Sequence, residues 1–263
     1  MTPDIVVDIG NTQVKWGVCD REGVKHMARL DATATAWDDC LSMWRRELPD
    51  LLPNRPLSWA IAGVVPDTRR TIQSWIEARG DSAVVLRSYQ QLPIEVRVDA
   101  PERVGIDRLL NAVAALCRSP GEPAVLIDIG SAVTVDWLDE AGAFQGGTIF
   151  PGFRLMARAL RAHTAQLPLV RLPKEVPIPP GRDTTSAMQS GIACAVAGGV
   201  FAVARQYGQR ASRRPIVCLT GGDAPTFRDL LVDLAKDDSQ VPAPTLWPEQ
   251  TLEGIRRSAE ALA

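Results

Sequence analysis

The sequence predicts an α/β fold made of two related halves, and two observations support this prediction. First, a strand-like segment that ends in Asp-Ile-Gly occurs twice: residues 6–12 are VVDIGNT and residues 126–132 are LIDIGSA. Second, each half begins with short valine- and isoleucine-rich segments and continues with segments of helical spacing. A strand, an acidic glycine turn and a returning strand in each half indicate that one hairpin has been duplicated.

The individual elements follow from the same patterns. Apolar runs bounded by glycine or acidic turns predict strands at residues 5–9, 14–19, 59–65, 124–127, 133–138, 144–150 and 216–219. Helical spacing predicts helices at residues 37–48, 68–78, 106–116, 153–163, 185–207 and 249–262. The proline-rich segment 167–180 is expected to be a loop. We expect two domains, residues 1–116 and 117–263.

Composition excludes several classes of protein. A formal net charge of −2 provides no positive surface for DNA or RNA. Five widely spaced cysteines without a CxxC motif predict reduced thiols rather than disulfides or a zinc site. The N-terminus has an acid within its first four residues and no basic flank, so we expect no signal peptide. We also expect no apolar run as long as a membrane span, and hence a cytoplasmic protein without a membrane partner.

The repeated hairpin is typical of phosphate chemistry. Glycine lets backbone N–H groups approach a triphosphate closely, and neighbouring hydroxyl or amide groups orient its oxygens, as Gly10, Asn11 and Thr12 would. Mg²⁺ is commonly held through waters and one or two carboxylates, for which Asp8 and Asp128 are candidates. Two such hairpins on one phosphate tail follow the logic of the actin and hexokinase architecture. A further glycine turn at 220–223 suits the adenosine end. The alternative is that each motif is only a tight turn.

A kinase for an acidic acceptor also needs a base and a cation. Asp107 and Arg108 provide both at the start of a predicted helix. The alternative is that Asp107 favours the helix N-terminus and that Arg108 is solvated.

Several motifs follow one another along the chain in a characteristic order. They are DIGNT at 8–12, GIDRLLNAVAA at 105–115, DIGSAVTVD at 128–136, GGTIFPGF at 146–153, TAQLP at 164–168, DTTSAMQSGI at 183–192 and TGG at 220–222. In these motifs the chain resembles the type III pantothenate kinases, a family that includes proteins named Bvg accessory factors. The resemblance implies two ribonuclease-H-like (actin-like ATPase) domains with a nucleotide cleft between them, and a homodimer. It also implies ATP-dependent phosphorylation of pantothenate to 4'-phosphopantothenate, the first step of coenzyme A biosynthesis.

The resemblance further implies residue roles and cofactors. ATP would be bound by Asp8, Ile9, Gly10, Asn11, Thr12, Gln13, Val14, Lys15 and Ser131. The acceptor would be bound by Gly105, Ile106, Asp107, Arg108 and Thr184, with Asp107 as the catalytic base. The family requires Mg²⁺ and a monovalent cation, K⁺ or NH₄⁺. Asp128 would bind the monovalent cation and Asp8 the Mg²⁺.

The chain departs from the family pattern at four positions. Ser131 replaces a threonine, Val98 a tyrosine that contacts pantothenate, Ala100 an asparagine and Asp183 an asparagine. Two alternatives therefore stay open: a kinase for another small hydroxy acid, and a non-catalytic regulatory or accessory protein of the same fold.

Overall fold

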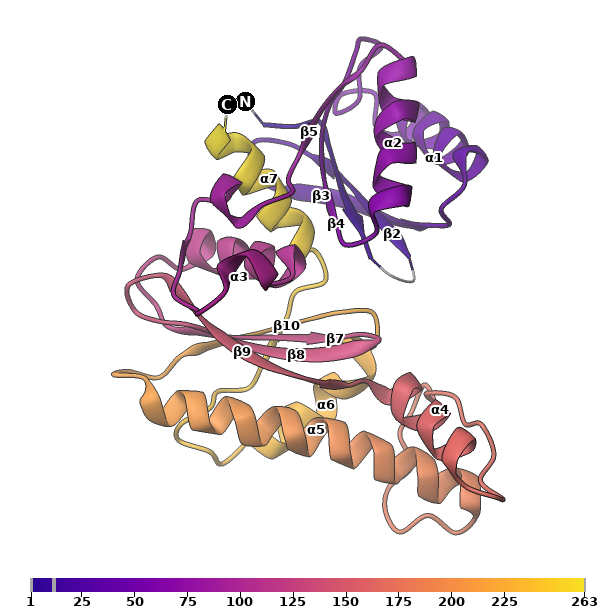
Figure 1. The fold of residues 1–263 in the computed structure, drawn as a ribbon, viewed down its shortest axis with the longest axis vertical. Helices are drawn as coiled ribbons and strands as arrows, with labels where there is room; N and C mark the ends of the chain where they lie inside the picture. Colours follow the sequence, from indigo (N-terminus) through magenta and orange to yellow (C-terminus); the bar gives the residue numbers. More distant parts are fainter. Residues whose placement is uncertain (1, 11–12, 263) are drawn as a thin grey trace. The chain divides into compact units, whose positions relative to one another are not determined.

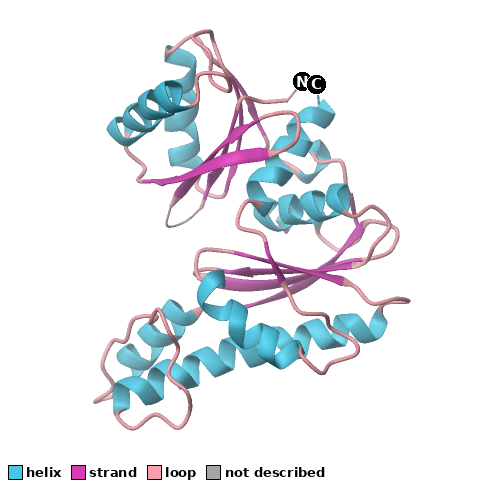
Figure 2. Cartoon of the chain, turned by 180° about the vertical axis from the view of Figure 1, so that it is seen from behind, coloured by secondary structure: helices cyan, strands magenta, loops and turns pink. Residues whose placement is uncertain are grey.

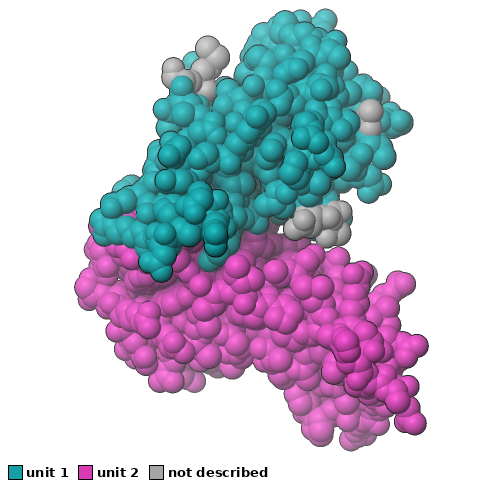
Figure 3. All heavy atoms as spheres, viewed as in Figure 1, with its two compact units in different colours: residues 1–120, 249–263 teal, residues 121–248 magenta. Residues whose placement is uncertain are grey.

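The chain forms two compact units. The structure is a computed structural model that describes residues 2–10 and 13–262. Unit 1 comprises residues 1–120 and 249–263, and unit 2 comprises residues 121–248 (Figure 3). This division differs from a simple cut after residue 116, because the C-terminal segment belongs to the first unit.

The elements occur in the following order. Unit 1 contains the strands β1 (Ile5–Ile9), β2 (Val14–Cys19), β3 (Val24–Leu30), β4 (Ser58–Gly63), β5 (Ser82–Val85) and β6 (Glu95–Val96), and the helices α1 (Ala34–Glu47), α2 (Pro66–Ala78), α3 (Ile106–Arg118) and α7 (Gln250–Leu262). Two short 3₁₀ helices are η1 (Tyr89–Gln91) and η2 (Pro101–Arg103). Unit 2 contains β7 (Ala124–Ile129), β8 (Ala132–Leu138), β9 (Ala143–Pro151), β10 (Ile216–Thr220) and β11 (Thr245–Leu246), and α4 (Phe153–His163), α5 (Thr184–Arg210) and α6 (Ala224–Ala235).

The sheet of unit 1 has the strand order β3-β2-β1-β4-β5. β1 pairs antiparallel with β2 and parallel with β4, and both neighbours are buried. Because side chains alternate along a strand, Val7 and Ile9 face the core that is formed with α1 and α2. Asp8 points to the opposite face. Helix α7 packs against β1, β2 and β4, as Figures 1 and 2 show.

The core of unit 1 is rich in tryptophan. Trp16, Trp37, Trp44 and Trp59 are almost completely buried there, and Trp16 lies 5.1 Å from Trp59, centroid to centroid. Trp75 joins the cluster at 5.7 Å from Trp16. These rings pack against one another, so the cluster stabilises the unit by apolar burial.

The sheet of unit 2 repeats the topology of the first. The strands that unit 2 contributes follow the order β9-β8-β7-β10-β11, with an antiparallel β7-β8 hairpin and a parallel β7-β10 pair. Val125, Ile127 and Ile129 belong to the core that is formed with α5 and α6, the helices that lie beside this sheet in Figure 1. The duplicated hairpin that the sequence indicates is therefore confirmed as two hairpins at equivalent positions in two sheets.

Helix α5 differs from the expectation that no apolar segment is as long as a membrane span. It has 27 residues and a mean hydropathy of 1.6 in its most apolar window, so by length and composition it is apolar enough to cross a membrane. The prediction that no segment reaches such a length is wrong for α5 by this measure. Met188, Ile192 and Val196 of α5 lie in the core of unit 2, and this packing accounts for its apolar composition.

Candidate active site

Asp8 lies at the carboxyl end of β1, directly opposite Lys15 of β2. Directly opposed residues of an antiparallel pair point to the same face, and the Lys15 Nζ atom lies 3.4 Å from the Asp8 carboxylate. Asp8 is only 7% exposed. The turn between the two strands is closed by a hydrogen bond from the Gly10 N–H to the Gln13 carbonyl oxygen. Asn11 and Thr12, which are expected to bind ATP, lie outside the described residues.

Asp107 occupies the first turn of α3, next to Gly105 at the N-cap. Its Oδ1 atom accepts a hydrogen bond of 2.9 Å from the Arg108 N–H. A Cβ atom on Gly105 would lie 2.6 Å from that same oxygen, so this carboxylate position requires glycine at 105. Asp107 is partly exposed, which leaves it accessible to an acceptor.

Asp8 and Asp107 lie within electrostatic range of each other. The pKa of the Asp8 carboxyl is raised above its ordinary value, chiefly by burial, and the negative charge of Asp107 raises it further. Lys15 acts in the opposite direction but does not outweigh burial. Two acids from segments about a hundred residues apart in the sequence thus share one region of unit 1. A buried carboxyl with a raised pKa, such as that of Asp8, is typical of functional sites.

Asp128 occupies the equivalent position at the carboxyl end of β7. It pairs in register with Thr134 of β8 and with Thr220 of β10, so the three side chains share one face of the sheet. The Oγ1 atoms of both threonines are buried and have no hydrogen-bond partner among the described residues. A Cβ atom on Gly221 would lie 2.5 Å from the Asp128 Oδ1 atom. Three oxygen-bearing side chains therefore gather at this strand end.

The two units share a further feature that the sequence analysis missed in unit 1. Gly63 is the last residue of β4 and Gly221 directly follows β10, and both have a positive φ, at 151° and 107°. A side chain on Gly63 would collide with the Ile9 carbonyl oxygen, and one on Gly221 with the Ile129 carbonyl oxygen. The sequence signal that could have identified both positions is a glycine at the end of a predicted parallel strand. Gly63 was overlooked because the predicted strand at 59–65 runs through it.

The remaining predicted site residues lie in separate places. Ser131 is exposed at the β7-β8 turn, and its carbonyl oxygen accepts from the Gly152 N–H at 3.1 Å. Thr184 is the exposed first residue of α5, directly after the N-cap Asp183. The Asp183 carboxylate accepts a hydrogen bond from the Ser186 N–H at 3.0 Å, so this residue, which replaces the asparagine of the family, caps the helix.

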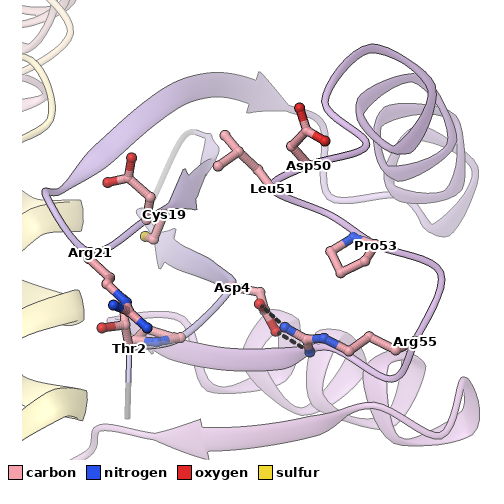
Figure 4. A pocket seen from close by; sticks show the side chains of 10 residues that line it. Thr2, Asp4, Cys19, Arg21, Asp50, Leu51, Pro53 and Arg55 are labelled. Atoms are coloured by element: carbon pink, nitrogen blue, oxygen red, sulfur yellow. Dashed lines mark hydrogen bonds and ion pairs between the residues drawn. The ribbon is translucent and has the colours of Figure 1, made fainter.

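One cavity of unit 1 lies apart from these residues. It has a volume of about 620 Å³ and is lined by residues that include Asp4, Cys19, Arg21 and Arg55 (Figure 4). Arg55 bonds both oxygens of Asp4, at 2.8 and 3.1 Å. Burial raises the pKa of the Cys19 thiol, which excludes a reactive thiolate here. None of the predicted site residues lines this cavity.

Comparison with known proteins identifies the family. The family model for type III pantothenate kinase matches residues 5–206. The chain belongs to the type III pantothenate kinase family. The type III pantothenate kinase of Desulfatibacillum aliphaticivorans is 30% identical over 96% of this chain and 96% of its own length. That of Azoarcus is 33% identical over 86% of this chain and 82% of its own length.

Solved structures confirm the fold class. A Baf family transcriptional activator from Campylobacter jejuni aligns with a TM-score of 0.58 at 15% identity, covering 98% of both chains. The activator of the 2-hydroxyisocaproyl-CoA dehydratase from Clostridium difficile, solved with bound ADPNP, aligns with a TM-score of 0.51 at 14% identity, over 99% of this chain and 96% of its own. At these identities the similarity shows the fold alone, which is that of the actin-like ATPases.

Proposed function

We propose that this chain transfers the γ-phosphoryl group of ATP to the hydroxyl group of pantothenate, forming 4'-phosphopantothenate in the first step of coenzyme A biosynthesis. The observation that carries the proposal is that the charge of Asp107 acts on the buried carboxyl of Asp8. The family resemblance makes Asp8 part of the phosphate-binding segment and Asp107 the base. Their proximity in unit 1 is what transfer from a bound phosphate to a neighbouring hydroxyl requires.

The chemistry then assigns roles to the residues of unit 1. The acceptor oxygen forms a bond to the γ-phosphorus while the bond to the bridging β-γ oxygen breaks, and Asp107 accepts the hydroxyl proton. Lys15 lies beside the buried Asp8 and provides positive charge at the phosphate end. Arg108 is placed next to the base and recognises the acceptor carboxylate, because a guanidinium can bond both carboxylate oxygens.

The family's cations fit the donor groups that are present. The buried carboxylate of Asp8 suits Mg²⁺, which keeps most of its waters and takes one or two carboxylates. Asp128, with the buried, unpartnered hydroxyls of Thr134 and Thr220 beside it, offers an all-oxygen set for K⁺ or NH₄⁺. When bound, such cations neutralise the charge that develops on the phosphates.

We further propose that the protein acts in the cytoplasm as a homodimer in which a second copy helps to complete the acceptor pocket. Unit 2 exposes Ile149 on β9, Leu155 on α4 and Ile178 before α5, at 62, 43 and 87%. These large exposed apolar side chains are the candidates for an association surface in unit 2. Light scattering tests this proposal: Ile149→Asp combined with Leu155→Asp should give a monomer, whereas Val84→Asp, at an exposed position of unit 1, should not.

The activity is tested by measuring ADP release with pantothenate, with pantoate and without acceptor, in the presence and absence of K⁺. The proposal requires turnover with pantothenate and K⁺. Turnover with pantoate alone would assign another hydroxy acid. Nucleotide binding without turnover on any acceptor would support an accessory protein instead.

The same activity assay, applied to a variant at Val98, tests how the acceptor is bound. The family's tyrosine hydroxyl contributes one hydrogen bond, typically about 0.5–1.5 kcal/mol, so its absence weakens acceptor binding several-fold without abolishing it. Val98→Tyr should therefore lower KM for pantothenate and leave KM for ATP unchanged. An unchanged KM for pantothenate would show that this position does not contact the acceptor.

A further inference from the structure

A second cavity lies within unit 2. Its volume is about 420 Å³, within the range of small-molecule pockets. Arg154 and Arg158 of α4, residues 169–172 and Asp223 line it. Apart from Asp223, which ends the glycine turn expected at the adenosine end, no residue expected to bind ATP, the acceptor or a cation belongs to this lining.

The lining of this cavity carries more positive than negative charge. The Arg154 Nη2 atom lies 2.8 Å from the Asp223 Oδ1 atom, and the Asp223 side chain is only 4% exposed. This pair fixes one guanidinium and neutralises it. Arg158 and Arg171 are exposed, and neither forms an ion pair with any residue that the structure describes. Two positive charges are thus left for a ligand.

Part of the cavity lining is apolar. Val170 is buried at 6% exposure and belongs to the core of unit 2, so it anchors the segment between α4 and α5. Leu169 beside it remains 59% exposed and lines the cavity with Leu172. Apolar side chains and guanidinium groups in one lining match a ligand with an anionic group on a hydrocarbon or aromatic body.

We propose that this cavity binds an organic anion, a phosphate ester or carboxylate, through Arg158 and Arg171, with its apolar part on Leu169 and Leu172. Arginine is suited to both anions because its planar donors can bond two oxygens at once. Arg154 has a different role: Asp223 holds it in place, and it forms the fixed edge of the cavity. The proposal does not depend on the kinase assignment, because it concerns equilibrium binding.

Two sources of such an anion are compatible with the position of the cavity. Asp223 directly follows the Gly221-Gly222 turn, which is expected at the adenosine end of the nucleotide. The ligand is then either part of ATP itself or a separate effector. Competition distinguishes them: ATP displaces a probe from a shared site and leaves a separate one occupied.

The test uses phenyl phosphate as the probe and phenol as its uncharged control, with binding followed by ligand-observed NMR on the full chain. Removing one charged hydrogen-bonding partner typically weakens binding by about tenfold or more. Arg158→Gln and Arg171→Gln should each have this effect. Arg161→Gln, an exposed arginine of the same helix outside the cavity, should change the affinity by less than about twofold.

Three results would overturn the proposal. They are no detectable binding of phenyl phosphate, equal binding of phenol, and an affinity that Arg161→Gln weakens as much as Arg158→Gln does. All of these substitutions are at exposed positions, so thermal unfolding should confirm that the variants remain folded.

Discussion

At the residue scale, a substitution of Asp107 tests the proposed base. A positioned base typically contributes about 10²–10⁴-fold to the rate. Asp107→Asn should lower kcat by this amount and leave the Kd for ATP unchanged, as measured by steady-state kinetics and calorimetry. A kcat close to that of the wild type would remove Asp107 from the base role.

The raised pKa of Asp8 predicts how the stability of the protein depends on pH. Its folded pKa is raised above the ordinary value of 3.8, so the folded state holds this proton more tightly than the unfolded state does. Stability from this group therefore falls as the pH rises from 3.8 through the raised pKa. Asparagine does not titrate. The difference in Tm between Asp8→Asn and wild type should increase from about pH 4 to about pH 7.

Asp20 serves as a control, because its pKa is lowered whereas that of Asp8 is raised. Desolvation is the largest single effect and raises its pKa, but hydrogen bonds from the Glu22 and Gly23 N–H groups and the charge of Lys25 together lower it more. Asp20→Asn should therefore lose stability relative to wild type as the pH rises from about 2 to about 4. If the Tm difference for Asp8→Asn decreased over its own range, the assignment of a raised pKa would be wrong.

At the scale of elements, the end of β10 depends on one glycine. Gly221 has a φ of 107°, and a Cβ atom there would collide with Asp128 and with the Ile129 carbonyl oxygen. Gly221→Ala should lower the free energy of unfolding by about 1–3 kcal/mol, measured by denaturant titration. Gly222→Ala is the matched control, because a Cβ atom at 222 meets no atom within 4 Å. Equal losses in both variants would contradict this account.

The elements also show where sequence patterns succeed. The strands β1 and β2 and the helix α4 have the predicted bounds, because a buried strand carries a dense apolar run and an amphipathic helix a regular spacing. β3, β5 and α6 were not predicted. β3 lies at the edge of its sheet and carries polar residues on its exposed positions, so its pattern is weak.

At the scale of the whole molecule, the C-terminal helix α7 packs in unit 1, with residues from the start of the chain. Arg256 is completely buried and pairs with Glu253 and with Glu260, the latter at 2.7 Å. Removing one partner of a buried ion pair typically costs about 3–5 kcal/mol. Arg256→Ala should therefore destabilise unit 1 by this amount, with faster hydrogen exchange in β1 and β4.

Arg257 is the matched control for that prediction. It contacts the same two glutamates but is 38% exposed, so Arg257→Ala should cost less than about 1 kcal/mol. If exchange increased in the strands of unit 2 and not in unit 1, the assignment of α7 to unit 1 would be refuted.

The sequence by itself determined the duplicated hairpin and the family. It also determined Asp8, Asp107 and Asp128 as candidate residues. These features depend on local motifs and apolar periodicity, which involve residues that are consecutive in the chain. Only the tertiary structure decided that Asp8 and Asp107 lie close together, since their proximity depends on how α3 packs in unit 1. It also revealed Thr134 and Thr220 beside Asp128, because strand register is not encoded locally. The return of α7 to unit 1 is equally a property of long-range packing.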